Sequence, residues 1–232
     1  GGRCAEGGRR GLGEPGVPAG CGAGGRGGAG LGPVGPRVVI EARGRGLVLE
    51  PVAAVWLVGA SLLTACNAPS AALWLQGIAE GKELVVLAHQ ERAARYRIAH
   101  VETTARNEGG TWRLTGLKNL VPAGAHANAF IVPARVSGAI NDPAGVALFL
   151  VPRGETGVTV RGYATQDGAC AADLTLTDAR AIEMLPAGAA VAGLERAIDN
   201  GIAAACAAAV GGMDKEVGAT LQDRTRGSES GG

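Results

Sequence analysis

The chain has 232 residues, 47% of them hydrophobic, and a formal net charge of +1 at neutral pH. A chain of this length and composition can bury a core in one domain or in two small ones. Its nearly neutral charge gives no electrostatic basis for binding nucleic acid or an anionic membrane surface.

The number and spacing of the cysteines bear on whether the chain has a zinc site or disulfide bonds. There are five, they lie far apart and they form no Cys-x-x-Cys pair: Cys4, Cys21, Cys66, Cys170 and Cys206. Their odd number and wide spacing support neither a zinc site nor a disulfide framework. We therefore predict no metal and expect a reducing, cytoplasmic compartment.

Residues 1–35 are dominated by glycine and carry almost no large apolar side chain. Such a segment cannot bury enough surface to offset its conformational entropy, so we predict that it is disordered. Its Gly-x-Gly patterns lack the preceding strand that a dinucleotide-binding loop requires, and composition alone explains them.

Residues 36–82 are predicted to form a partial N-terminal helical domain. A first helix, over 37–49, ends before Pro51, because a residue that precedes proline is disfavoured in the α conformation. The uncharged run 52–66 is shorter than the roughly 18 residues of a membrane span, so a buried helix is predicted there, with a membrane anchor as the alternative. A third helix is predicted over 71–78.

Residues 83–182 are predicted to form a middle β domain. Apolar runs rich in Val, Ile, Leu and Thr recur at short intervals, each bounded by Gly, Pro, Asn or Asp, which is typical of antiparallel strands. Gly109 and Gly110 supply the positive φ that a tight hairpin needs, and Trp112 and Leu114 then alternate with polar residues. We predict a small barrel or sandwich of seven strands, near 84–89, 97–105, 111–115, 129–136, 146–151, 157–161 and 172–177.

Residues 183–232 are predicted to begin a C-terminal helical domain. After Pro186, apolar residues recur at intervals of three or four, which places them along one stripe of a helix. The stripe consists of Leu194, Ile198, Ile202, Cys206, Val210, Met213, Val217 and Leu221. It is predicted to be a docking face for another helix.

Several motifs of the β region occur in the order found in a known family. A strand ends in Ala88-His89-Gln90-Glu91, and the hairpin from Gly110 to Lys118 has the form Gly-x-Trp-x-Leu-x-Gly-x-Lys. The apolar segments 127–135, 146–151 and 157–160 follow. This succession resembles the middle β domain of the acyl-CoA dehydrogenases, flavoenzymes that desaturate acyl thioesters. The segment Gly-Tyr-x-Thr-Gln-Asp-Gly at 162–168 is similar to one in bacterial pimeloyl-CoA dehydrogenase small subunits.

The resemblance extends over about residues 30–213 and implies an α+β fold. In that fold, a small antiparallel β-barrel or sandwich is flanked by N-terminal helices and by the first helix of a C-terminal helical bundle. In the family, a glutamate removes the α proton of the acyl thioester while FAD accepts the β hydrogen as hydride. That glutamate would follow residue 232, so the resemblance places no catalytic residue in this chain. We expect a C-terminally truncated member with impaired activity.

The resemblance also implies which residues contact FAD. The family's Thr-Glu-Pro-x-x-Gly-Ser strand end corresponds to residues 90–96, and its Trp-x-Thr segment to residues 120–122. The cofactor-binding candidates are His89, Gln90, Arg95, Tyr96, Leu120, Val121 and Pro122.

Three of these candidates differ from the family's residues in an informative way. Gln90 keeps a group that hydrogen-bonds the pyrimidine edge of the flavin. Leu120 lacks the aromatic stacking of the family's Trp, and Pro122 has neither a hydroxyl nor an N–H. The alternative for Leu120 and Val121 is that both are ordinary core residues.

The resemblance further implies an acyl-CoA substrate, electron-transfer flavoprotein as the electron acceptor, and a homo- or hetero-oligomer assembled through the C-terminal helix. The alternative function is a non-catalytic scaffold or the small partner subunit of a hetero-oligomer. Flavin absorbance separates the two, because only the first requires bound FAD.

Overall fold

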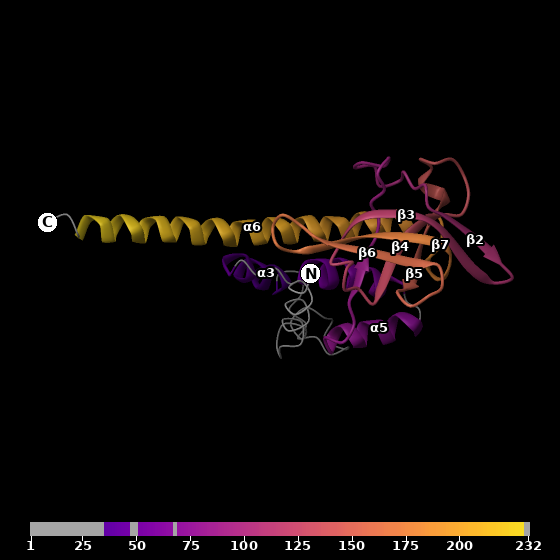
Figure 1. Cartoon of the computed structure of the whole chain (residues 1–232), viewed down its shortest axis with the longest axis horizontal. Helices are drawn as coiled ribbons and strands as arrows, with labels where there is room; N and C mark the ends of the chain where they lie inside the picture. The colour runs from indigo at the N-terminus through magenta and orange to yellow at the C-terminus, as the bar shows by residue number, and fades with distance from the viewer. Residues whose placement is uncertain (1–34, 47–50, 67–68, 230–232) are drawn as a thin grey trace.

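The computed structural model describes residues 35–46, 51–66 and 69–229 (Figure 1). The predicted disorder of residues 1–35 lies outside these ranges, except for Gly35, which begins the first helix. The helical elements are α3 (Gly35–Arg45), η1 (Ala53–Gly59), α4 (Ala60–Ala65), α5 (Pro69–Ala79), η2 (Pro143–Gly145) and α6 (Ala190–Glu229). The strands are β1 (Val85–Leu87), β2 (Thr104–Glu108), β3 (Thr111–Pro122), β4 (Ala129–Arg135), β5 (Val146–Pro152), β6 (Val158–Ala164) and β7 (Cys170–Leu185).

The three predicted N-terminal helices are present, although α3 ends at Arg45 and residues 47–49 of the first predicted helix lie outside the described ranges. The uncharged run 52–66 is the continuous helix η1–α4, whose first part has π-helical hydrogen bonding and whose apolar face, including Val55 and Leu62, is buried. Helix α5 ends at Ala79, and Gly81 follows it with a φ of 68°, in the left-handed region that commonly terminates helices. In the described ranges, no helix combines the length and the apolar composition that crossing a bilayer requires.

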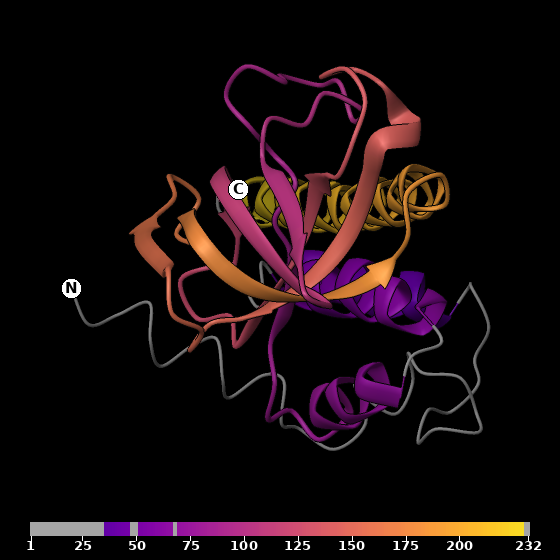
Figure 2. The same cartoon turned by 90° about the vertical axis from the view of Figure 1, so that its right-hand side faces the viewer.

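The β domain is a closed barrel. Its strands follow the order β1-β4-β2-β3-β7-β5, and β4 also pairs with β5, so five of the strands form a ring. Strand β6 adds to β7, and the pairings are antiparallel apart from β4 with β1 and with β2. Figure 2 shows the strands curving around the domain, with the helices on one side. The α+β class is therefore confirmed, and the described residues form seven strands, six of which lie close to the predicted ranges.

The prediction of a strand over residues 97–105 is wrong for most of its length. The strand β2 starts only at Thr104, and residues 97–103 are irregular. The guanidinium of Arg135 explains the difference, since it donates hydrogen bonds to the carbonyl oxygens of Ala99 (2.9 Å) and Val101 (3.1 Å). These carbonyls are satisfied by a side chain instead of by a neighbouring strand.

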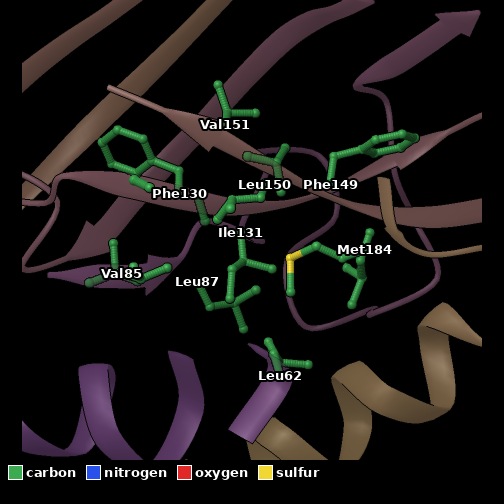
Figure 3. Close-up of a cluster of buried hydrophobic side chains, with 14 of the residues drawn as sticks. Leu62, Val85, Leu87, Phe130, Ile131, Phe149, Leu150, Val151 and Met184 are labelled. Carbon is green, nitrogen blue, oxygen red and sulfur yellow. The ribbon is translucent and has the colours of Figure 1, made fainter. Parts of the chain in front are cut away.

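The core lies where β4 and β5 face the N-terminal helices (Figure 3). All seven residues of β4 are buried, as are six of the seven of β5. Leu62 of α4 and Met184 of β7 pack into the same cluster, so the helices and the barrel share one core. At its edge, Trp112 meets Phe149 edge-on, with the ring centroids 5.1 Å apart.

Helix α6 has 40 residues and is therefore about 60 Å long at 1.5 Å per residue. Its first part lies against the barrel and η1, its middle part lies alongside α3, and its C-terminal part extends beyond both (Figure 1). The contact with α3 is close because glycines lie on both sides. A Cβ on Gly44 would collide with the backbone of Ala208, and one on Gly211 with that of Glu41.

Candidate functional site

The structure brings together the ends of two strands that the sequence motifs mark. Gln90 follows β1, and its carbonyl oxygen accepts a hydrogen bond from the Asn119 N–H of β3 at 2.9 Å. Near this contact, β3 contains a bulge. Its residues Lys118 and Val121 pair with Leu174 and Ala172 of β7, so β3 carries one extra residue there.

The bulge turns Leu120 outward. Leu120 has a φ of 47°, and its side chain is 48% exposed. Its neighbour Val121 is 1% exposed and belongs to the core, while Pro122 is exposed. The interpretation as a core residue therefore holds for Val121 and not for Leu120.

Asp173 of β7 holds the bulge in place. Its carboxylate accepts hydrogen bonds from the Leu120 N–H (3.3 Å), from the Arg161 guanidinium (2.8 Å) and from the Tyr163 hydroxyl (3.3 Å). The bond from Arg161 is the main reason that the pKa of Asp173 lies below its usual value. Sequence reasoning missed this residue. The available signal was an acidic residue within the otherwise apolar segment 170–174, shortly after the motif at 162–168.

A buried ion pair lies behind the strand ends. The Lys118 ammonium donates to the Glu91 carboxylate at 2.7 Å and to the Pro133 carbonyl at 2.8 Å, and both charged side chains are almost completely inaccessible to solvent. Glu91 also accepts hydrogen bonds from the Thr103 N–H (2.9 Å) and hydroxyl (2.6 Å) and from the Glu102 N–H. This pair joins the end of β1 to β3 directly before the bulge.

Burial and charge act against each other in this pair. Burial lowers the pKa of Lys118 to about 8, even though Glu91 favours its charged form. Burial opposes the ionisation of Glu91, but Lys118 and the surrounding donors outweigh it, so the pKa of Glu91 lies below its usual value. Both groups are therefore ionised at neutral pH, and the pair acts as a structural link.

The other strand-end side chains are neutral. Burial, together with the positive charge of Lys118, lowers the pKa of His89 to about 4, so its imidazole is uncharged at neutral pH. Asn119 leaves its Oδ1 buried without a hydrogen-bond partner in the part of the chain that the structure describes. The backbone N–H of the same residue donates to the carbonyl of the half-buried Gln90.

Arg95 and Tyr96 differ from the other candidates. They lie on the turn that follows Glu91, where Arg95 has a φ of 52° and Tyr96 is 97% exposed. No hydrogen bond or ion pair between described residues joins either of them to Gln90 or Leu120. The structure therefore groups five of the seven candidates, namely His89, Gln90, Leu120, Val121 and Pro122, and does not link the other two to them.

The grouped residues fit a flat ligand that has an apolar face and a polar edge, as the isoalloxazine ring of FAD has. Leu120 offers an exposed apolar side chain, and Gln90 offers an amide that both donates and accepts. The N–H groups of Asn119, Leu120 and Ala123 already donate to Gln90, Asp173 and Cys170, and Pro122 has none. At these positions, hydrogen bonds donated to a ring must therefore come from side chains.

Comparison with known proteins shows what the barrel is similar to. Residues 87–179 match the family model of the acyl-CoA dehydrogenase middle domain. No curated protein sequence matches the chain.

Solved structures share this fold. The chain is similar to a variant of the Tcur3481-Tcur3483 steroid ACAD, with a TM-score of 0.71 and 26% identity over 83% of this chain and 50% of that one. It is similar to butyryl-CoA dehydrogenase from Megasphaera elsdenii, with a TM-score of 0.77 and 19% identity over 84% and 54%. It is also similar to the ChsE4-ChsE5 complex from Mycobacterium tuberculosis, with a TM-score of 0.72 and 23% identity over 89% and 54%. The chain spans about half the length of these proteins.

Proposed function

We propose that this chain, which carries the middle domain of the acyl-CoA dehydrogenase family, is part of a flavin-dependent acyl-CoA dehydrogenase and covers one side of an FAD ring. The reaction is the α,β-desaturation of an acyl-CoA thioester. The observation that carries the proposal is the bulge that turns Leu120 outward beside Gln90. Leu117 of the same strand is equally exposed, so what distinguishes Leu120 is its position on the bulge beside Gln90, where an apolar side chain and an amide lie together.

Each grouped residue has a proposed role toward the ring. Leu120 packs on its apolar face, and the Gln90 amide hydrogen-bonds its pyrimidine edge. Val121, which is buried in the core, and Pro122 hold the strand directly after that contact. His89 is neutral at physiological pH, so it adds no charge beside the ring.

Arg95 and Tyr96 have a separate proposed role. Both are exposed on one turn, and Arg95 carries a positive charge that suits the pyrophosphate of FAD. Substituting Arg95 with Ala is therefore expected to weaken FAD binding without changing the position of the flavin absorption bands, because the ring surroundings stay the same.

The chemistry of the proposed reaction depends on the bound group. When bound, FAD supplies the acceptor for the hydride that leaves the β carbon of the acyl chain. The residues of this chain orient the ring and exclude water from the side that they cover. We propose electron-transfer flavoprotein as the acceptor of the reducing equivalents, and we expect low activity from this chain by itself.

The test is a titration of FAD into the purified chain, in which the quenching of flavin fluorescence measures binding. The informative variant is Leu120→Asp, and the matched control is Leu117→Asp. Both leucines are 48% exposed and lie on β3, but Leu117 lies before the bulge. We expect Leu120→Asp to weaken FAD binding at least tenfold and Leu117→Asp to leave it within twofold. Equal effects of the two variants, or no binding of FAD by the unmodified chain, would overturn the proposal.

A further inference from the structure

The segment 162–168, Gly-Tyr-x-Thr-Gln-Asp-Gly, has no role in the proposed flavin contact so far. It begins in β6 and contains the turn that leads into β7. In this turn, the Asp167 carboxylate accepts hydrogen bonds from the Thr165 hydroxyl and from the Ala169 N–H (3.1 Å). Gly168 has a φ of 85°, a conformation that favours glycine. The turn therefore fixes the register in which β6 pairs with β7.

This register places two polar side chains of β6 on the same face of the sheet as Asp173 of β7. Arg161 pairs directly with Asp173, and Tyr163 lies two residues further along β6. The Arg161 guanidinium donates to one oxygen of the Asp173 carboxylate at 2.8 Å, and the Tyr163 hydroxyl donates to the other at 3.3 Å. The Asp173 side chain is only 18% exposed, so water competes little for these bonds. We call these three residues the Asp173 network.

The Asp173 network reaches β3 at the bulge. The carboxylate oxygen that accepts from Tyr163 also accepts from the Leu120 N–H, at 3.3 Å. A φ of 47° is unfavourable for a residue with a Cβ atom, so contacts from other residues must hold Leu120 in that conformation. The neighbouring N–H groups of Asn119 and Ala123 donate to backbone carbonyls. The N–H of Leu120 depends instead on a side chain, that of Asp173.

A second contact joins β6 to the turn that follows β3. Gly162 lies between Arg161 and Tyr163 and therefore faces the opposite side of β6. A Cβ at this position would lie 2.8 Å from the Cβ of Ala125, so only glycine allows this close approach without a shift. The Arg153 guanidinium holds the same turn, since it donates to the Ala125 carbonyl at 2.9 Å. Strand β6 thus supports both the bulge and the turn directly after it.

We propose that the Asp173 network positions Leu120 for the flavin contact, so that Asp173 and Tyr163 are positioning residues that act on FAD binding through Leu120. This inference rests on the proposed function and identifies the residues that set the geometry of its central contact. Without the carboxylate, the Leu120 N–H loses its acceptor, and the backbone relaxes from the left-handed conformation. The leucine side chain then leaves its position beside Gln90.

A double-mutant cycle on FAD binding tests whether Asp173 acts through Leu120. Asp173→Ala is expected to raise the FAD dissociation constant at least tenfold. Tyr163→Phe is expected to raise it about threefold, because the carboxylate keeps its other hydrogen bonds. In a Leu120→Ala chain, which has no leucine side chain to position, each change is expected to alter the dissociation constant less than twofold. Equal effects in both backgrounds would indicate a purely structural role and overturn the proposal.

Thr159→Val is the matched control for these variants. It removes a hydroxyl from the same face of β6, at a position that pairs with Thr175 instead of Asp173. We expect it to leave the FAD dissociation constant within twofold of that of the unmodified chain. An effect as large as that of Tyr163→Phe would show that any change in β6 weakens binding, and it would contradict the specific role of the Asp173 network.

Hydrogen exchange, measured by NMR on the chain without FAD, separates this inference from the proposed function. Asp173→Ala is expected to speed the exchange of the Leu120 amide at least tenfold and to shift the Leu120 methyl signals, whereas Thr159→Val changes neither. Unchanged exchange would overturn the positioning role, whether or not FAD binds. If exchange accelerates but the unmodified chain binds no FAD, the proposed function fails, while the control of Leu120 by Asp173 stands.

Discussion

The substitution Lys118→Met tests how the strand ends are held together. Methionine fills a similar volume but removes the ammonium that donates to Glu91 and to the Pro133 carbonyl. The Glu91 carboxylate then remains buried without its counter-ion. Removing one partner of a buried pair leaves an uncompensated charge, which is far more costly than losing an exposed pair.

The expected loss of stability follows from the remaining contacts of Glu91. Breaking a buried pair typically costs about 3 to 5 kcal/mol. The carboxylate keeps three hydrogen bonds, from the Thr103 N–H and hydroxyl and from the Glu102 N–H, so the lower end of that range applies. A loss of about 3 kcal/mol corresponds to a fall in Tm of roughly 6 to 12 °C for a chain of this size.

The assay is urea unfolding at pH 7 of the unmodified chain, of Lys118→Met and of the double variant Lys118→Met with Glu91→Gln. Glutamine carries no charge, and its single oxygen still accepts from the Thr103 N–H and hydroxyl, although the hydrogen bond from the Glu102 N–H is lost. The double variant is therefore expected to recover at least about 1 kcal/mol relative to Lys118→Met alone. If the double variant is less stable than Lys118→Met, the buried charge is not the cause of the loss and the reasoning is refuted.

Three further predictions concern other parts of the structure. The pKa of His89 is about 4 in the folded chain and near its ordinary value of 6.5 after unfolding, so the unfolded state binds more protons between these values. Stability is therefore expected to be lost as the pH falls from 6.5 to 4, and His89→Gln should flatten that part of the curve of urea midpoint against pH. Arg135 donates to five carbonyl oxygens, so Arg135→Met is expected to increase hydrogen exchange first in residues 97–103, and uniform exchange would contradict this. Gly211→Ala is expected to lower the Tm by several degrees because its Cβ collides with α3, whereas Gly218→Ala meets open space and should not lower it.

Local signals in the sequence were sufficient for most of the fold. The Gly109-Gly110 pair has the positive φ values of 62° and 86° that a two-residue hairpin needs, and the hairpin forms there. The change to a helical period after Pro186 predicts α6. The closure of the barrel by β4 has no such local signal, since it depends on pairing with strands on both sides. The irregular segment 97–103 depends in the same way on Arg135, which lies more than thirty residues away.

The candidate site was predictable only in part, for a related reason. The motifs identify Gln90 and Leu120, and the structure places them at neighbouring strand ends. The outward direction of Leu120 follows from a bulge, which changes the alternation of buried and exposed residues and cannot be read from that alternation. Asp173, which stabilises the bulge, lies more than fifty residues further along the chain and becomes evident only once β3 and β7 are paired.

The most direct measurement of the central claim is an NMR titration of isotope-labelled chain with FAD, which reports on the strand-end side chains themselves. We predict that the largest chemical-shift changes occur at the Leu120 methyl groups and the Gln90 side-chain amide, while the Leu117 methyl groups change little. Changes of equal size at Leu117, or changes confined to residues remote from the bulge, would contradict the claim that these strand ends cover a flavin.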